Sequence, residues 1–350
     1  MEIGVSPKIK TYSGGLGVLA GDTLKAAADH GLNFTAVTMM YRKGYFNQVI
    51  ENGEQNETPQ EWDYFQKLED TGVKTSVRIR GQEVEIKAWK YTIEGENGEV
   101  DVYFLDTGLD SNRDEDKRLT EQLYMGGQEE RLCQEAILGI GGVRILKELG
   151  IQTDYFHMNE GHSALLTTEA DGKKVFTTHT PVPAGHDKFS EQLVEKILPQ
   201  DKLEILEFTG ELNMTELALE NSSYCNAVSD RHAEVSRDMF PGYDIDAVTN
   251  GVHSSTWSIE PFSKLFDENI PRWRVDPARL TKVAGINDNE IWQAKKEAKK
   301  RLSEHLEEYE GEELDLETFT VGFARRSTSY KRPTLIFRDL DRLESLADEY

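Results

Sequence analysis

The feature that most constrains the fold is a regular alternation of strand-like and helix-like segments between residues 154 and 249. Runs typical of buried strands occupy residues 154–158, 174–179, 224–228 and 246–249. Helical patterns lie between them, at residues 162–167, 191–197 and 230–238. Strands that alternate with helices form parallel sheets, because a parallel pair needs a long crossover and the helix supplies it. The sequence therefore predicts an α/β fold in which helices cover a parallel sheet.

The part of the chain before residue 154 adds a buried strand at 34–41 and a small antiparallel excursion. Polar and apolar residues alternate at 75–80, 83–89 and 100–105, and Gly81 and Gly98 mark the turns. A long helix follows at 128–149, with one apolar face and Gly150 as its end.

The pattern changes after residue 287. A long charged helix at 287–309 is followed by an acidic turn, a strand at 319–323, a basic loop and a helix from about residue 333. We expect one domain over residues 1–317 and the start of a second at 318–350. A lone strand and helix cannot bury a core, so we expect the chain to stop early within that second domain.

The charge of the chain argues against several classes of partner. The formal net charge is −24, which repels nucleic-acid backbones and anionic membrane surfaces and is typical of a salt-adapted cytoplasm. The longest apolar run, residues 136–145, is shorter than the ~20 residues of a membrane span. Only Cys133 and Cys225 could form a disulfide, and two buried reduced thiols in a cytoplasmic protein are the expected outcome.

A glycine-rich turn at residues 12–22, YSGGLGVLAGD, leads into a helix. Glycines let a backbone approach a ligand closely, and the N–H groups at a helix start bind anions. The turn also fits the glycine pattern of dinucleotide-binding sites. However, no acidic residue ends the next strand to bind the ribose of NAD, so the remaining dinucleotide alternative is an NADP site that uses Arg42. Tight helix packing without a ligand is the other alternative.

Polar residues follow three of the predicted strands. His157 lies at the end of one, with Glu160 and His162 just after it, His179 ends the next, and Asn250 begins a polar segment after a third. Ligands of open α/β sheets bind at the carboxyl ends of parallel strands, so we expect a site here rather than a metal site. Glu160 has no evident carboxylate partner, which disfavours simple glycoside hydrolysis.

The basic run RRSTSYKR at residues 325–332 opposes the sign of the rest of the surface. It follows a predicted strand and precedes a predicted helix, where phosphate is commonly held, so we interpret it as an anion site.

Taken in order, six motifs resemble those of the α-glucan phosphorylases, and more narrowly their short microbial branch. They are TYSGGLGVLAGD, YRKGYFNQ, HMNEGHSALL, FTTHTPVPAGHD, TNGVHSSTW and RRSTSYKR, and they span nearly the whole chain. The resemblance implies the GT-B fold, in which two Rossmann-like domains face a cleft. It also implies cleavage of α-1,4-glucan by inorganic phosphate, giving α-glucose 1-phosphate with retention, with pyridoxal 5'-phosphate as cofactor.

The resemblance also implies roles for individual residues. Gly14 and Gly15 would lie beside the cofactor phosphate and the substrate anion, with Leu16 nearby. His179 and Asn250 would bind the 6-hydroxyl of the sugar, and Glu160 and His162 would belong to the same substrate site. Trp257 would pack near the pyridoxal ring. Arg326 and Lys331 would clamp the attacking phosphate, and Arg325 would reach the cofactor phosphate.

In this family the lysine that binds the cofactor lies in the second domain, beyond residue 350. The chain is therefore expected to supply the N-terminal half of a site and to be inactive alone, with a separate C-terminal half chain or a homodimer as partner. Phosphorylation control is not visible in it. The alternatives are a GT-B glucosyltransferase of the glycogen-synthase type and a non-catalytic glucan-binding fragment.

Overall fold

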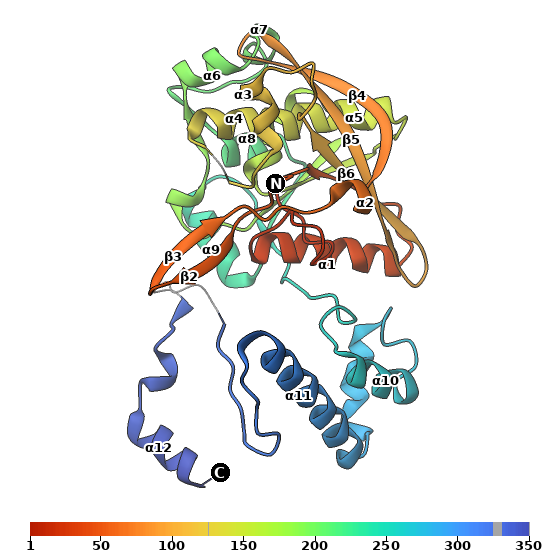
Figure 1. The fold of residues 1–350 in the computed structure, drawn as a ribbon. Helices are drawn as coiled ribbons and strands as arrows, with labels where there is room; N and C mark the ends of the chain where they lie inside the picture. The colour runs from red at the N-terminus through yellow and green to blue at the C-terminus, as the bar shows by residue number, and fades with distance from the viewer. Residues whose placement is uncertain (125, 325–330, 350) are drawn as a thin grey trace. The chain divides into compact units, whose positions relative to one another are not determined.

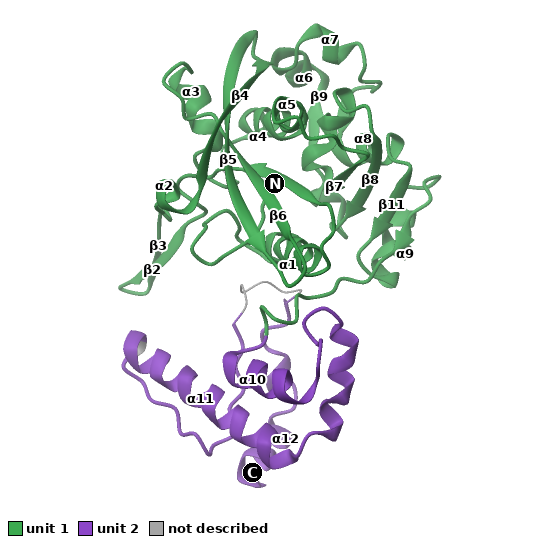
Figure 2. Cartoon of the chain, turned by 90° about the vertical axis from the view of Figure 1, so that its right-hand side faces the viewer, with its two compact units in different colours: residues 1–257 green, residues 258–350 purple. Residues whose placement is uncertain are grey.

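The computed structural model describes residues 1–124, 126–324 and 331–349 (Figure 1). The chain forms two compact units, residues 1–257 and 258–350, coloured separately in Figure 2.

The first sheet of unit 1 contains both parallel and antiparallel pairs. Its strands, in the order β1-β6-β5-β4, are β1 (Thr35–Met39), β6 (Glu99–Asp106), β5 (Gln82–Glu94) and β4 (Glu69–Ile79). The expected antiparallel strands are therefore present as β4, β5 and β6, but they do not form a separate excursion, because β6 pairs in parallel with β1.

Helices cover both faces of this sheet. Along β6, Val102 and Phe104 belong to the cluster beneath α1 (Gly15–Asp29), whereas Tyr103 and Leu105 belong to the larger core on the other face. Successive side chains of a strand point to opposite faces, so this alternation marks a sheet that is buried on both sides.

The second sheet of unit 1 is entirely parallel, as the sequence predicted. Its order is β12-β11-β8-β7, with β7 (Tyr155–Asn159), β8 (Lys173–Thr178), β11 (Tyr224–Ala227) and β12 (Asp246–Ala247). The carboxyl ends of these strands lie at one edge, which is where the polar residues of the sequence analysis are found.

The predicted long helix at 128–149 is present, with an unexpected break. It consists of α4 (Gln128–Ala136), a π-helical turn η2 (Ile137–Gly141) and α5 (Gly142–Glu148). A Cβ atom at Gly139 would lie 2.7 Å from the backbone nitrogen of Leu166 in the 3₁₀ helix η3 (Gly161–Thr168). The glycine thus allows the close packing of these two segments, and π turns of this kind commonly occur where a helix is locally adapted to a neighbour.

The remaining elements of unit 1 are short. The helices are α2 (Tyr64–Lys67), α3 (Asp114–Lys117), η1 (Arg118–Thr120), η4 (Pro183–Gly185), α6 (Glu191–Ile197), α7 (Gln200–Leu203), α8 (Met214–Glu220) and α9 (Asp230–Met239). Two antiparallel pairs complete it, β2 (Asn47–Glu51) with β3 (Glu54–Thr58) and β9 (Lys188–Ser190) with β10 (Glu211–Asn213). Cys133 and Cys225 are buried free thiols, as predicted.

Unit 2 is helical in its described part. Its elements are α10 (Glu260–Asn269), η5 (Pro277–Gly285), α11 (Asp288–Glu310), η7 (Leu335–Phe337) and α12 (Leu340–Glu349). A small core gathers around Trp273, which is 1% exposed. The strand expected at 319–323 is not formed, and Phe319, Val321 and Phe323 are exposed. A strand needs a neighbouring strand to satisfy its backbone groups, and none pairs with this segment in the described residues.

The compact units divide after Trp257, and the domain boundary expected near residue 317 stays a prediction. Among the helices of the described residues, none combines the length and the apolar character that crossing a membrane requires.

Candidate active site at the carboxyl edge of the parallel sheet

Glu160 joins the ends of two neighbouring parallel strands. It follows β7 directly and is 5% exposed. One carboxylate oxygen, Oε2, accepts the backbone N–H of His179 at 2.8 Å and the hydroxyl of Thr180 at 2.9 Å, and Oε1 accepts the N–H of Gly161 at 3.2 Å. Burial raises the pKa of Glu160, and the three donors act in the opposite direction. Both oxygens are occupied, so this side chain fixes the loop that carries His179.

Glu160 also has an unusual backbone conformation, with φ of 74°. Residues other than glycine rarely adopt this left-handed region, and such strain is found mainly where the surrounding structure holds a functional residue in place. The three hydrogen bonds of the Glu160 carboxylate supply that restraint here.

The imidazole of His179 is neutral and has an unused nitrogen. Burial, together with His232 and His157, lowers the pKa of His179 to about 4. Its Nε2 atom is buried and has no hydrogen-bond partner among the described residues, and the same is true of Nδ1 of His162 and Nε2 of His232. Buried polar atoms are normally paired, so unpaired imidazole nitrogens at a strand edge are available to a ligand. A neutral imidazole is better suited to bind an uncharged hydroxyl group than to bind a charged group.

A hydrogen-bonded row of side chains crosses the sheet beneath this edge. Nε2 of His157 lies 2.8 Å from the hydroxyl of Thr177, which donates to Oδ1 of Asn226 at 2.8 Å. The row links β7, β8 and β11 and keeps their ends in register. The sequence points to His157 but not to Thr177 and Asn226, because polar residues within a strand give no signal of what they pair with.

An ion-pair network lies next to His162. Arg131 on α4 contacts Asp187 at 2.9 Å and the buried Glu135 at 3.2 Å, and Nε2 of His162 lies 3.7 Å from Asp187. Burial lowers the pKa of His162 well below its usual value and raises that of Glu135 well above its own. Sequence reasoning missed Arg131 and Asp187, which come together only through the packing of α4.

The glycine turn already holds a carboxylate of the chain itself. Oε2 of Glu2, a residue 3% exposed, accepts the N–H groups of Ser13 at 2.6 Å and Gly14 at 3.3 Å. Sequence reasoning missed Glu2, although a single acidic residue in the apolar run before the turn is a recognisable signal. The turn therefore presents its amides to an anionic oxygen, as the N-terminus of a helix is suited to do.

The glycines of this turn divide into two groups. A Cβ atom at Gly21 would lie 2.0 Å from the carbonyl oxygen of Gly4, and one at Gly17 would lie 2.5 Å from Cβ of Tyr12. Those two glycines serve close backbone packing. At Gly14 and Gly15 an added Cβ would meet no atom of a more distant described residue within 4 Å, so among these residues open space adjoins the start of α1. Leu16 is half-buried in the same first turn.

The polar segment after β12 packs along α1. Oδ2 of Asp22 accepts the N–H of His253 at 3.1 Å and the indole N–H of Trp257 at 2.7 Å, while the ring of His253 contacts Asp29 at 2.8 Å. The indole is 60% exposed, and Asp22 lies about 10 Å along the helix from Gly15. Asn250 begins this segment with an exposed side chain.

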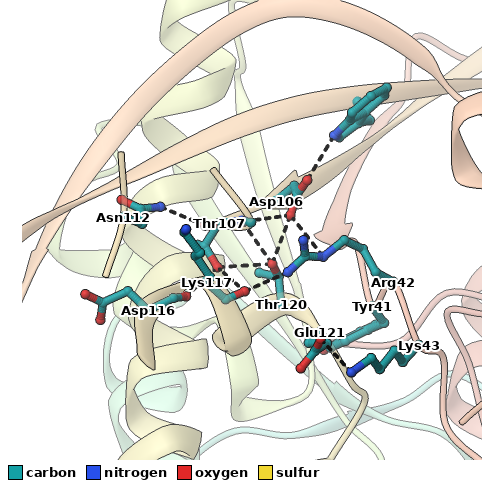
Figure 3. Close-up of polar contacts among 12 residues, drawn as sticks. Tyr41, Arg42, Lys43, Asp106, Thr107, Asn112, Asp116, Lys117, Thr120 and Glu121 are labelled. Atoms are coloured by element: carbon teal, nitrogen blue, oxygen red, sulfur yellow. Dashed lines mark hydrogen bonds and ion pairs between the residues drawn. The ribbon is translucent and has the colours of Figure 1, made fainter. Parts of the chain in front are cut away.

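Arg42 is already engaged within the protein, as Figure 3 shows. Its Nη2 donates to the carbonyl of Lys117 at 2.8 Å, and its Nε lies 3.6 Å from Asp106. Asp106 in turn accepts from Thr120 and Trp89. A guanidinium held in this way is poorly placed to bind the 2'-phosphate of NADP, which disfavours that alternative.

The basic residues of the proposed phosphate clamp remain predictions. Arg325 and Arg326 lie outside the described residues, and Lys331 is a half-buried residue of unit 2. Over residues 1–124, 126–324 and 331–349, no group of three or more His, Cys, Asp or Glu side chains is arranged to hold a metal ion.

Comparison with known proteins places these features in a family. A family model described as "Starch synthase catalytic domain" matches residues 4–251, which is most of the chain. The chain belongs to this glycosyltransferase family. The match and the parallel sheet β12-β11-β8-β7 are consistent with the predicted GT-B type of α/β fold.

Several of its curated relatives are named as phosphorylases. The chain is 36% identical to a maltodextrin phosphorylase of Thermococcus litoralis, 32% to a glycogen phosphorylase of Mycobacterium tuberculosis and 30% to a glycogen phosphorylase of Aquifex aeolicus. Each match covers 99% of this chain and 48%, 49% and 59% of the respective relative. The motif-based recognition of the α-glucan phosphorylases is thus confirmed, and the chain spans about half the length of the relatives it matches.

Proposed function

We propose that this chain supplies the N-terminal half of an α-glucan phosphorylase site. The reaction is phosphorolysis of the terminal α-1,4 link of a glucan or maltodextrin, giving α-glucose 1-phosphate with retention. The observation that carries the proposal is the neutral imidazole of His179, whose buried Nε2 has no partner in the described part of the chain and whose backbone is fixed by Glu160.

The chemistry of the sugar accounts for this arrangement. A glucose residue is uncharged, so oriented neutral donors and acceptors discriminate it better than charged groups do. In this proposal His179 and Asn250 would bind the 6-hydroxyl of the glucose residue. Glu160 and His162 complete the substrate side, with Glu160 positioning the loop rather than acting as an acid, since both of its oxygens accept hydrogen bonds.

The attacking phosphate needs a cationic and amide-rich environment, because it is a weak nucleophile that must be held close and partly desolvated. We assign this role to Arg326 and Lys331 together with the glycine turn. The carboxylate of Glu2 on the amides of Ser13 and Gly14 supports that assignment, since the turn accepts an anionic oxygen.

The same region fits pyridoxal 5'-phosphate. The open space beside Gly14 and Gly15 would admit its phosphate, and the exposed indole of Trp257, anchored on Asp22, offers a flat surface to its ring. Leu16 and Arg325 would lie nearby. When bound, the cofactor supplies a phosphate group that exchanges a proton with the substrate phosphate. The Schiff-base lysine of this family is expected in the C-terminal half of the site, outside residues 1–350.

A split assay tests the proposal. The chain is assayed alone and mixed with the half of the Thermococcus litoralis relative that it does not match, with maltodextrin, phosphate and pyridoxal phosphate at high salt. We expect the mixture to release glucose 1-phosphate and the chain alone to release none. With His179→Ala the mixture should release it at least tenfold more slowly, because a hydrogen bond to the transition state is lost. Undiminished activity of the His179→Ala mixture would refute the assigned role. Release of glucose 1-phosphate by the chain alone would refute the proposal that the chain supplies only half of the site.

One observation favours a second candidate, a glucosyltransferase of the glycogen-synthase type. The family model that matches residues 4–251 is described as a starch synthase catalytic domain. Calorimetric titration with ADP-glucose and with phosphate separates the two functions. Binding of the sugar nucleotide without binding of phosphate would support the transferase.

A further inference from the structure

His232, on the first turn of α9, has a buried hydrogen-bond donor without an acceptor in the described part of the chain. Its side chain is 7% exposed, and the backbone N–H of Val228 donates to its Nδ1 at 3.3 Å. A neutral imidazole carries its hydrogen on the nitrogen that does not accept, which is Nε2 here. This Nε2 is buried, and no described residue accepts from it. A buried donor without an acceptor costs free energy, so an acceptor supplied by a ligand would bind favourably there.

The ladder between β8 and β11 brings His232 close to His179. Its last pair is Ala227 with Thr178, so Val228 and His179 are the next residues of the two neighbouring chains. The imidazole of His232 is bonded to the backbone of Val228 and therefore lies on the same side of the sheet edge. The two rings are near enough for His232 to contribute, after burial, to the lowered pKa of His179.

The segment that begins at Asn250 meets the chain at the same residue. The backbone N–H of Asn250 donates to the carbonyl of Val228 at 3.1 Å. The two backbone groups of Val228 therefore join His232 to the segment that the proposed function places at the 6-hydroxyl of the sugar. All of these residues belong to unit 1.

We propose that His232 is a further binding residue for the hydroxyl group that His179 binds, and that the two rings together select a hydroxyl at this position. The Nε2–H of His232 donates to the hydroxyl oxygen, and the hydroxyl donates to Nε2 of His179, which also has no partner among the described residues. A hydroxyl can accept and donate at once, whereas a carboxylate only accepts and an ammonium only donates. Either of those would leave one buried nitrogen unpaired. The identity of the hydroxyl as the 6-hydroxyl of glucose rests on the proposed function.

The nitrogen resonances of the imidazole rings test this inference on the whole chain without turnover. In protein that contains isotopically labelled histidine, NMR shows which ring nitrogen carries the hydrogen. We expect hydrogen on Nε2 in His232 and on Nδ1 in His179. Glucose should shift the resonances of both rings, and 6-deoxyglucose should bind about tenfold more weakly, because it lacks the group that both nitrogens bind.

Two variants separate binding by His232 from a structural role. Glutamine has an amide N–H near the position of Nε2 but cannot accept from Val228, whereas asparagine has a carbonyl near the position of Nδ1 but no group that reaches as far as Nε2. His232→Gln should therefore keep the preference for glucose over 6-deoxyglucose, and His232→Asn should lose it. Ser236→Ala removes another buried hydroxyl without a described partner, one turn further along α9, and as the matched control it should keep the preference. Retention of the preference by His232→Asn would overturn the inference, because His232 would then act only through Val228.

The outcome for His232 is separable from that for the proposed function. If glucose shifts the resonances of His179 but not those of His232, the inference is overturned and the role of His179 stands. A shift of both rings that requires the 6-hydroxyl supports the inference even if the split assay shows no phosphorolysis. If glucose shifts neither ring, the inference is overturned, and the split assay alone decides the proposed function.

Discussion

The carboxylate of Glu160 accepts the backbone N–H of His179 at 2.8 Å, across the ends of two paired parallel strands. The same oxygen accepts the hydroxyl of Thr180. Because the strands β7 and β8 are fixed by their ladder, this contact sets where the His179 loop leaves the sheet. The position of His179 is thus held by the residue that follows a different strand.

Removal of this carboxylate should destabilise the protein. Glu160→Ala leaves a buried N–H and a hydroxyl without an acceptor, and we expect a loss of about 3 kcal/mol in the free energy of unfolding. Thr180→Val removes only one of the bonds and should cost about 1 kcal/mol. Urea unfolding at pH 7 measures both. Equal effects of the two variants would contradict the role given to Glu160.

The pH dependence of stability should carry a contribution from His179. Its pKa is about 4 in the folded protein against about 6.5 in the unfolded chain. Below pH 6.5 the unfolded chain binds a proton that the folded protein does not, so stability falls as the pH drops towards 4. Between pH 7 and pH 5 the loss from this residue amounts to about 2 kcal/mol.

The measurement compares the wild type with His179→Asn, which cannot titrate. Urea unfolding at pH 7 and at pH 5 should show a smaller acid loss in the variant, by about that amount. The comparison is needed because Glu160 has a raised pKa and contributes with the opposite sign. If the wild type and the variant lost the same stability between pH 7 and pH 5, burial would not be what lowers the pKa of His179.

The pair formed by Asp106 and Arg42 should matter more for stability than exposed ion pairs do. Asp106 is 4% exposed and also accepts from Thr120. Asp106→Ala leaves the guanidinium without its carboxylate, and we expect a loss of about 3 kcal/mol. Asp110→Ala, at a fully exposed carboxylate near Lys117, should change stability by less than about 0.5 kcal/mol. Thermal unfolding of both variants checks the difference, and similar melting temperatures would contradict it.

The sequence predicted the local elements well, because their signals are local. The strands β7, β8 and β11 and the helix α6 lie within one or two residues of their expected positions. Hydrophobic periodicity depends only on neighbouring residues, and it also gave the order of strands and helices from which the parallel sheet follows.

Relationships between distant segments could not be predicted in this way. The parallel pairing of β6 with β1 and the contact of Arg131 with Asp187 depend on tertiary packing, which periodicity does not encode. The strand expected at 319–323 has the right composition, but no strand among the described residues pairs with it. At the site, the strand-end residues were found because parallel strands end at a common edge, whereas Glu2 was missed because its partners lie 11 and 12 residues away.

The two groups of glycines in the turn before and along α1 predict two different mutant behaviours. In Gly21→Ala the new Cβ would lie 2.0 Å from the carbonyl oxygen of Gly4, and since backbone cannot move aside cheaply, we expect a loss of about 2 kcal/mol. In Gly14→Ala the new methyl group meets no atom of a more distant residue within 4 Å in the part of the chain that the structure describes, and the φ of −152° suits alanine, so the loss should stay below about 1 kcal/mol. Binding should respond in the reverse order. The methyl group at position 14 occupies the space we assign to an anion, so Gly14→Ala should weaken phosphate binding in calorimetry at a temperature where both variants are folded, while Gly21→Ala should bind as the wild type does. A Gly14→Ala variant that binds phosphate normally would mean that the open space beside the turn serves no anion.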